Sequence, residues 1–280
     1  MWYHGLFHLQ SRLQNLLKGG VTCWALQQPK FKSLFPLAIH GHHTASKSLN
    51  CAWQQHEDHF VTFFEVWSSD YQETIYGRMW YFTSDFSRGD TAYTKLALDR
   101  HTDTTYFQEP CGVQVFHCLK HEGTGGRTLL VDGFYAAEQV LQKAPEGFEL
   151  LSKVPLKHEY IENVGECHNH MIGVGPVLNI YPWNKELYLI RYNNYDRAVI
   201  NTVPYDVVHR WYTAHRTLTI ELRRPENEFW VKLKPGRVLF IDNWRVLHGR
   251  ESFTGYRQLC GCYLTRDDVL NTARLLGLEA

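Results

Sequence analysis

The segments AYTKLALDRHTD (residues 92–103) and FIDNWRVLHGR (residues 240–250) predict the fold of this chain. His101, Asp103 and the distant His248 form the ligand set of a facial triad, which binds ferrous iron and leaves the opposite positions open. Residues two apart on a strand point to the same side, so the third ligand must come from another strand. The separation of 248 − 101 = 147 residues therefore predicts a long β-barrel whose early and late strands are neighbours.

Each part of this pattern has an ordinary alternative. An HxD triplet is common by chance, and the chain has a second one, His56-Glu57-Asp58, without supporting context. A single histidine such as His248 is more often a satisfied or exposed side chain. The order of HTD, the aromatic-rich second segment and Arg257, nine residues after His248, makes the conjunction specific. Aspartate in place of cysteine favours iron over structural zinc.

The chain resembles the γ-butyrobetaine/trimethyllysine dioxygenases, which are iron(II)- and 2-oxoglutarate-dependent enzymes of carnitine biosynthesis. The resemblance covers residues 73–280, about three quarters of the chain, and implies hydroxylation of N6,N6,N6-trimethyllysine at carbon 3 with release of succinate and CO2. It also implies ascorbate as a cofactor and a homodimer. The matching segments are TIYGRMWYFTSDF (74–86), AYTKLALDRHTD (92–103), GGRTLLVDGF (125–134), YNNYDRA (192–198) and FIDNWRVLHGR (240–250).

The resemblance assigns the cosubstrate to three residues. Arg257 would pair with the distal carboxylate of 2-oxoglutarate, since a guanidinium binds a carboxylate bidentately. Thr128 would donate a hydrogen bond to it, and Arg250 is a second candidate.

A trimethylammonium group donates no hydrogen bond, so it is recognised by cation–π contacts with aromatic rings. The resemblance assigns that cage to Tyr76, Trp80, Tyr93 and Tyr263. Tyr76 and Trp80 are four residues apart and share one face if the segment is helical. The alternative is that these rings fill the core.

Trimethyllysine carries an α-ammonium that γ-butyrobetaine lacks. Asp90 lies three residues before Tyr93, at the position that the resemblance gives to the contact with this ammonium, and Asn193 would bind the substrate carboxylate. Either could instead be a solvated loop residue. Asp90 is the feature that favours trimethyllysine over γ-butyrobetaine.

The amino-terminal part departs from the family. Family members carry a zinc-binding domain and further strands before the first matching segment, whereas about seventy residues precede Glu73 here. We expect a leader over residues 1–50, a junction over 51–72 and the catalytic domain over 73–280. The chain resembles a shortened form.

Residues 1–50 contain no Asp or Glu, and leucines recur there at helical spacing. Such a basic, amphipathic, acid-free start is typical of a transit peptide and predicts the mitochondrial matrix. A surface helix or a disordered arm is the alternative. The histidines of HGHH (40–43) lack acidic or cysteine partners, which disfavours a metal site there.

Composition excludes several classes of protein. Lys+Arg and Asp+Glu both number 29, so no charge excess favours nucleic acid. No apolar run approaches the roughly 18 residues of a membrane span. The seven cysteines form no CxxC pair, as in a reduced intracellular protein. The glycines at 123, 125 and 126 have no following Lys-Ser/Thr and make no phosphate loop.

Short β-branched and aromatic runs separated by turn residues predict strands. Asp132 and Pro204 predict the starts of two helices, and Asp267 that of a third. Cys167, His168 and His170 are interpreted as loop residues. The pattern predicts a mainly β (α+β) double-stranded β-helix, or jelly roll, with flanking helices. The barrel is either complete or lacks some of its early strands. The predicted strands are 112–118, 127–131, 154–161, 187–192, 228–234, 237–241 and 259–264.

Three functional alternatives stay open. The first is γ-butyrobetaine hydroxylation. The second is a catalytically silent shortened form that binds full-length subunits. The third is a binding module for trimethylated lysine, which the HTD, His248 and Arg257 set disfavours because such a module needs no iron.

Overall fold

The computed structural model describes residues 72–83 and 91–275. Eight strands form two four-stranded antiparallel sheets. The first sheet has the order β1 (Trp80–Phe82), β12 (Arg257–Leu264), β3 (Val113–His121), β10 (Val238–Asp242). The second has the order β2 (Leu98–His101), β11 (Val246–Arg250), β4 (Thr128–Asp132), β9 (Glu228–Val231).

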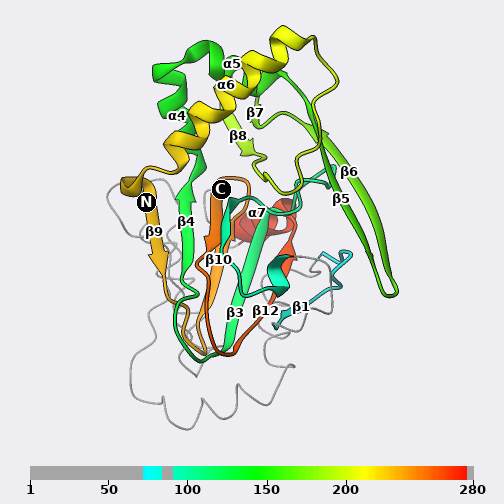
Figure 1. Ribbon diagram of the computed structural model, residues 1–280, viewed down its shortest axis with the longest axis vertical. Helices are drawn as coiled ribbons and strands as arrows, with labels where there is room; N and C mark the ends of the chain where they lie inside the picture. Colours follow the sequence, from blue (N-terminus) through cyan, green and yellow to red (C-terminus); the bar gives the residue numbers. More distant parts are fainter. Residues whose placement is uncertain (1–71, 84–90, 276–280) are drawn as a thin grey trace.

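The strand order confirms the predicted jelly roll. If these eight strands are numbered along the chain, the sheets read 1-8-3-6 and 2-7-4-5, so successive strands alternate between the sheets except for strands 4 and 5, which are neighbours in one sheet. Figure 1 shows the long β3 and β4 running through the body of the molecule. The earliest strands are short, with three residues in β1 and four in β2. In the described part of the chain, the early strands of the barrel are therefore present but short.

Close packing against Gly261 holds β1 on the first sheet. Trp80 and Gly261 are Cα partners, and a Cβ added at Gly261 would lie 2.1 Å from the indole ring. The ring instead stacks beside Phe82, with centroids 4.4 Å apart, and meets Phe116 edge-on. Trp80 is therefore a core residue, 2% exposed.

The described part of the chain has four α-helices beside the sheets: α4 (Gly133–Lys143), α5 (Pro145–Lys153), α6 (Tyr205–Leu222) and α7 (Arg266–Leu275). Asp132 caps α4 as predicted, because its side chain accepts hydrogen bonds from the backbone N–H groups of Phe134 and Tyr135. The helix predicted to start at Pro204 is α6, which has Pro204 at its N-cap and buries Trp211 and Leu218 fully. Helices α4, α5 and α6 gather at one end of the molecule (Figure 1). No described helix is both long and apolar enough to cross a membrane.

Two predictions of local structure were wrong or missing. Residues 167–170, interpreted as a loop, begin β6 (Cys167–Gly175), which pairs along its length with β5 (Leu156–Val164). The polar side chains of His168 and His170 lie on an exposed ribbon, so the usual apolar signal of a strand was weak. Helix α5 and strand β7 (Leu178–Ile180) were not predicted, whereas β8 (Leu187–Ile190), the partner of β7, lies within the predicted strand 187–192.

The predicted leader (1–50), most of the junction (51–72) and Asp90 lie outside the described residues.

Candidate metal centre

The two histidines of the predicted triad lie directly opposite each other on neighbouring strands. His101 ends β2, His248 is the middle residue of β11, and the two are Cα partners. Asp103 follows β2 in a bend, so of the two HTD ligands only His101 lies on a strand. The bend, and not the alternation of side chains along a strand, places the Asp103 carboxylate beside His101. The ligand atoms of the three residues all lie within 4.8 Å of one another. The structure thus confirms the predicted grouping of these side chains.

Asn243 holds the HTD bend in place. Its Oδ1 accepts a hydrogen bond from the Asp103 N–H at 2.8 Å, and its Nδ2 donates to the carbonyls of Asp103 and Cys111 at 3.1 and 2.9 Å. The side chain is 1% exposed, so these bonds form away from water. Sequence reasoning missed this role, although Asn243 lies in the segment that also carries His248.

Hydrogen bonding directs the His101 ring. Its Nδ1 lies 2.7 Å from the Asp99 carbonyl and can donate to it, which leaves the lone pair on Nε2, 3.2 Å from Asp103 Oδ1. A metal-binding histidine is commonly fixed in this way. His248 Nε2 lies 3.8 Å from Asp103 Oδ2. The three groups therefore lie close together, and a His101 ring that donates from Nδ1 presents the lone pair of Nε2 toward Asp103.

The electrostatics of the three groups match this arrangement. Burial lowers the pKa of His248 to about 3, so the ring is neutral and able to act as a ligand. Burial alone would raise the pKa of Asp103, but His248, His101 and Tyr263 offset it and the pKa is about 2. Burial lowers the pKa of His101, yet the hydrogen bond and charge of Asp103 leave it raised overall. The site thus offers an ionised carboxylate beside a neutral His248.

A cavity of about 280 Å³ opens beside these ligands. Nine of the twelve predicted site residues line it: Tyr76, His101, Asp103, Thr128, Asn193, His248, Arg250, Arg257 and Tyr263. Trp80 and Tyr93 do not, because the Trp80 ring lies over Gly261 and Tyr93 is buried beside Phe82, with ring centroids 5.1 Å apart. Asp90 lies outside the described residues.

Arg257 is a buried cation without a counter-charge in the described part of the chain. It is 6% exposed, lines the cavity, and has neither a hydrogen bond nor an ion pair among the described residues, with Nε buried and unsatisfied. Burial lowers its pKa to about 10. An unpaired guanidinium in a cavity calls for an anion, because a buried charge is costly unless it is paired. Arg257 therefore fits the carboxylate of a ligand.

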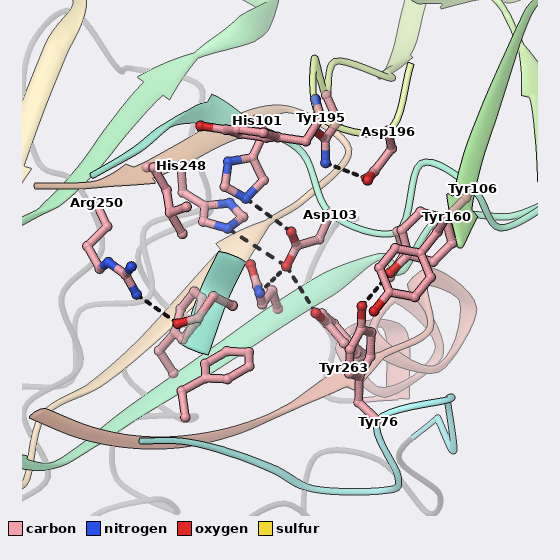
Figure 2. A pocket seen from close by; sticks show the side chains of 18 of the residues that line it. Tyr76, His101, Asp103, Tyr106, Tyr160, Tyr195, Asp196, His248, Arg250 and Tyr263 are labelled. Carbon is pink, nitrogen blue, oxygen red and sulfur yellow. Dashed lines mark hydrogen bonds and ion pairs between the residues drawn. The ribbon is translucent and has the colours of Figure 1, made fainter. Parts of the chain in front are cut away.

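Arg250, the second predicted candidate, is already engaged. Its guanidinium donates to the backbone carbonyls of Ala92, Thr94 and Leu96 at 2.9, 2.6 and 2.8 Å. Figure 2 shows it directed at the chain before the HTD motif. Arg250 therefore ties that loop to β11, and the cavity's available cation is Arg257.

The aromatic wall of the cavity differs from the predicted one. Tyr106 and Tyr160 line it together with Tyr76 and Tyr263. Neither Tyr106 nor Tyr160 was predicted from the sequence. The Tyr76 and Tyr106 hydroxyls lie 2.8 Å apart, and the Tyr106 and Tyr160 rings stack with centroids 4.8 Å apart. Figure 2 shows these four tyrosines together, on the side of Asp103 away from the two histidines.

The conditional helical interpretation of Tyr76 and Trp80 is wrong. Tyr76 lies in a turn in which Gly77 N donates to the Thr74 carbonyl at 2.8 Å, and Trp80 begins a strand. With this backbone the two side chains point in different directions. Tyr76 lines the cavity, whereas Trp80 is buried in the core.

Asn193 lines the cavity from within a polar turn. Its Oδ1 accepts from the Tyr195 N–H at 2.9 Å, and its Nδ2 donates to Asp196 Oδ2 at 2.6 Å. Asp196 and Glu159 also line the cavity, and neither was predicted. The cavity thus has a wall of tyrosines and, elsewhere, acidic and amide groups.

Comparison with known proteins places the chain in a family. The family model described as Taurine catabolism dioxygenase TauD, TfdA family matches residues 52–263. The chain belongs to this family. It is 60% identical to the human protein named "Trimethyllysine dioxygenase, mitochondrial" in an alignment of 421 positions that covers both chains fully. It is 92% identical to the chicken protein of that name over 209 residues, which are 75% of this chain and 50% of the relative.

The fold also has solved counterparts. The crystal structure of a putative alpha-ketoglutarate-dependent taurine dioxygenase from Burkholderia xenovorans matches with a TM-score of 0.56 and 16% identity, over 75% of this chain and 74% of that one. The chain itself is shortened. Its 280 residues leave at least 421 − 280 = 141 positions of the alignment with the human relative without a counterpart.

Proposed function

We propose that this chain is an iron(II)- and 2-oxoglutarate-dependent dioxygenase that hydroxylates N6,N6,N6-trimethyllysine at carbon 3. The observation that carries the proposal is the convergence of His101, Asp103 and His248 in one cavity with the unpaired Arg257. Two imidazoles and one carboxylate suit ferrous iron. Relatives named trimethyllysine dioxygenase support the substrate.

A ferrous ion bound by these three residues would supply the oxidation of a C–H bond by dioxygen, coupled to conversion of 2-oxoglutarate into succinate and CO2. The protein's own contribution is binding and orientation. His101, Asp103 and His248 all line the cavity, so substrates bound in it would lie next to the metal.

Arg257 and Thr128 would orient the cosubstrate. Arg257 supplies a buried positive charge for the distal carboxylate, and Thr128, which is 5% exposed and lines the same cavity, supplies a hydroxyl. Both lie at the first residues of their strands, β12 and β4. This position fixes one end of a dicarboxylate and leaves its other end for the metal.

The tyrosine wall would hold the trimethylammonium group. Tyr76 and Tyr263 have ring centroids 6.4 Å apart, and Tyr106 and Tyr160 extend the wall. Each ring contributes about 0.5–2 kcal/mol to such contacts. With Asn193, and Asp90 as the predicted partner of the α-ammonium, at the amino-acid end, carbon 3 would be held near the metal.

Further parts of the proposal rest on the family and on the sequence. They are a first step of carnitine biosynthesis, ascorbate as a cofactor, a homodimer with no nucleic-acid partner, and location in the mitochondrial matrix. The domain division is a leader over 1–50, a junction over 51–72 and a catalytic domain over 73–280. A reporter fused to residues 1–50 should enter mitochondria, and a cytosolic reporter would refute the leader.

The alternatives are γ-butyrobetaine hydroxylation and a silent shortened form that binds full-length subunits. The deciding experiment reconstitutes the purified chain with ferrous iron anaerobically and measures metal content. It then measures succinate and hydroxylated product with trimethyllysine and with γ-butyrobetaine. Product from trimethyllysine supports the proposal, preference for γ-butyrobetaine contradicts the substrate, and bound iron with no turnover identifies the silent form.

A further inference from the structure

Asp103 has two oxygens in different surroundings. Oδ1 lies 3.2 Å from His101 Nε2. Oδ2 accepts hydrogen bonds from Tyr263, whose hydroxyl lies 3.0 Å away, and from Gln114 Nε2. Figure 2 shows the Tyr263 hydroxyl directed at Asp103 from below the two histidines. Two donors thus occupy Oδ2, which also lies 3.8 Å from His248 Nε2, and leave Oδ1 toward His101.

The two donors reach Asp103 because they are direct neighbours across the sheet. Gln114 on β3 and Tyr263 on β12 are Cα partners in an antiparallel pair. Side chains of directly opposed residues project from the same face. Asn243 holds the backbone N–H and carbonyl of Asp103, and the register of the two strands fixes where both donors meet the carboxylate.

Gln114 is a polar residue whose burial costs folding free energy at its position. It is 1% exposed, and its Oε1 is buried without a hydrogen-bond partner among the described residues. A buried unsatisfied amide oxygen costs free energy that an apolar side chain would avoid. The bond from Nε2 to Asp103 is the one feature here that an apolar residue could not reproduce.

We infer that Gln114 and Tyr263 are positioning residues that hold Asp103 as a one-oxygen ligand, with Oδ1 on the metal and Oδ2 tied to the sheet. A carboxylate released from these donors could bind through both oxygens and fill a position needed by the cosubstrate. Because Tyr263 also belongs to the tyrosine wall, it links the proposed trimethylammonium site directly to a metal ligand. The inference rests on the proposed iron site.

The test uses Gln114→Leu and Tyr263→Phe in the full chain, with cobalt(II) as a redox-inert probe whose visible spectrum reports coordination. We expect each variant to weaken cobalt affinity by about 10–100-fold, as is usual when a partner of a metal ligand is removed. We also expect weaker d–d absorption, because a second carboxylate oxygen raises the coordination number, and weaker binding of 2-oxoglutarate to the cobalt form.

Tyr192→Phe is the matched control. Tyr192 is also a buried tyrosine, but its hydroxyl bonds to Thr219 on α6 at 2.8 Å, so its removal should leave cobalt affinity and spectrum unchanged. Thermal unfolding without metal reports whether each variant folds, and Gln114→Leu should melt no lower than wild type. Variants with wild-type cobalt affinity and spectrum would overturn the inference. A wild-type chain that binds no cobalt would instead contradict the proposed metal site.

Discussion

Arg257→Met should stabilise the protein without ligand and weaken 2-oxoglutarate binding, two effects of opposite sign from one substitution. Burial lowers the pKa of this arginine from 12.5 to about 10. At 1.36 kcal/mol per pKa unit, the charged form costs about 3 kcal/mol in the folded state. Because the folded pKa lies below the unfolded one, this cost applies in full at every pH well below 10, including neutral pH. Methionine, similar in length and uncharged, would remove most of it.

The same change removes the proposed partner of the cosubstrate. Loss of one member of a buried charge pair costs about 2–5 kcal/mol of binding, which raises Kd for 2-oxoglutarate by about 30-fold or more. At a ligand concentration about 100 times the wild-type Kd, 2-oxoglutarate stabilises the wild type by about 2.7 kcal/mol and the variant by less than about 1 kcal/mol. Thermal unfolding with manganese(II), with and without 2-oxoglutarate, measures both effects.

Arg245→Met provides the control. Arg245 is also a largely buried arginine, but it is paired with Asp132 at 2.8 Å, so its loss should lower Tm and leave the 2-oxoglutarate shift intact. If Arg257→Met lowers Tm as Arg245→Met does, or keeps the wild-type shift with 2-oxoglutarate, Arg257 is a structural residue and the reasoning fails.

Three further predictions concern the metal, the cage and the substrate. His248→Ala should abolish stoichiometric ferrous binding, since a two-ligand site remains; metal analysis showing wild-type iron would disprove the ligand assignment. Tyr106→Ala should raise KM for trimethyllysine by about 2- to 30-fold through the lost ring contact, whereas Trp80→Phe should mainly lower Tm. If steady-state kinetics and melting instead showed a raised KM for Trp80→Phe and mainly a lower Tm for Tyr106→Ala, Trp80 and not Tyr106 would belong to the cage. Asp90→Asn should reduce the preference for trimethyllysine over γ-butyrobetaine, and an unchanged ratio of kcat/KM values would show that Asp90 does not contact the amino group.

Several features could be predicted from the sequence because their causes are local. The Asp132 cap and the apolar face of α6 depend on residues within a few positions of each other, and the structure has both. The candidate metal ligands could be predicted from a motif whose spacing suits strand geometry. Even there, Asp103 lies in a bend beyond β2, held by Asn243 from a segment 140 residues away.

The cavity wall required the tertiary structure. Sequence reasoning could not separate Trp80, which faces the core over Gly261, from Tyr76, which faces the cavity, because the difference depends on a turn and on strand pairing. Tyr160 comes to the wall on β5, a strand whose partner β6 was taken for a loop. Gln114 had no sequence signal at all. The sequence by itself determined which residues can bind iron and a dicarboxylate, since that is a matter of side-chain chemistry. Only the tertiary structure decided which neighbours face them, because the face that a side chain takes is fixed by register between strands distant in the chain.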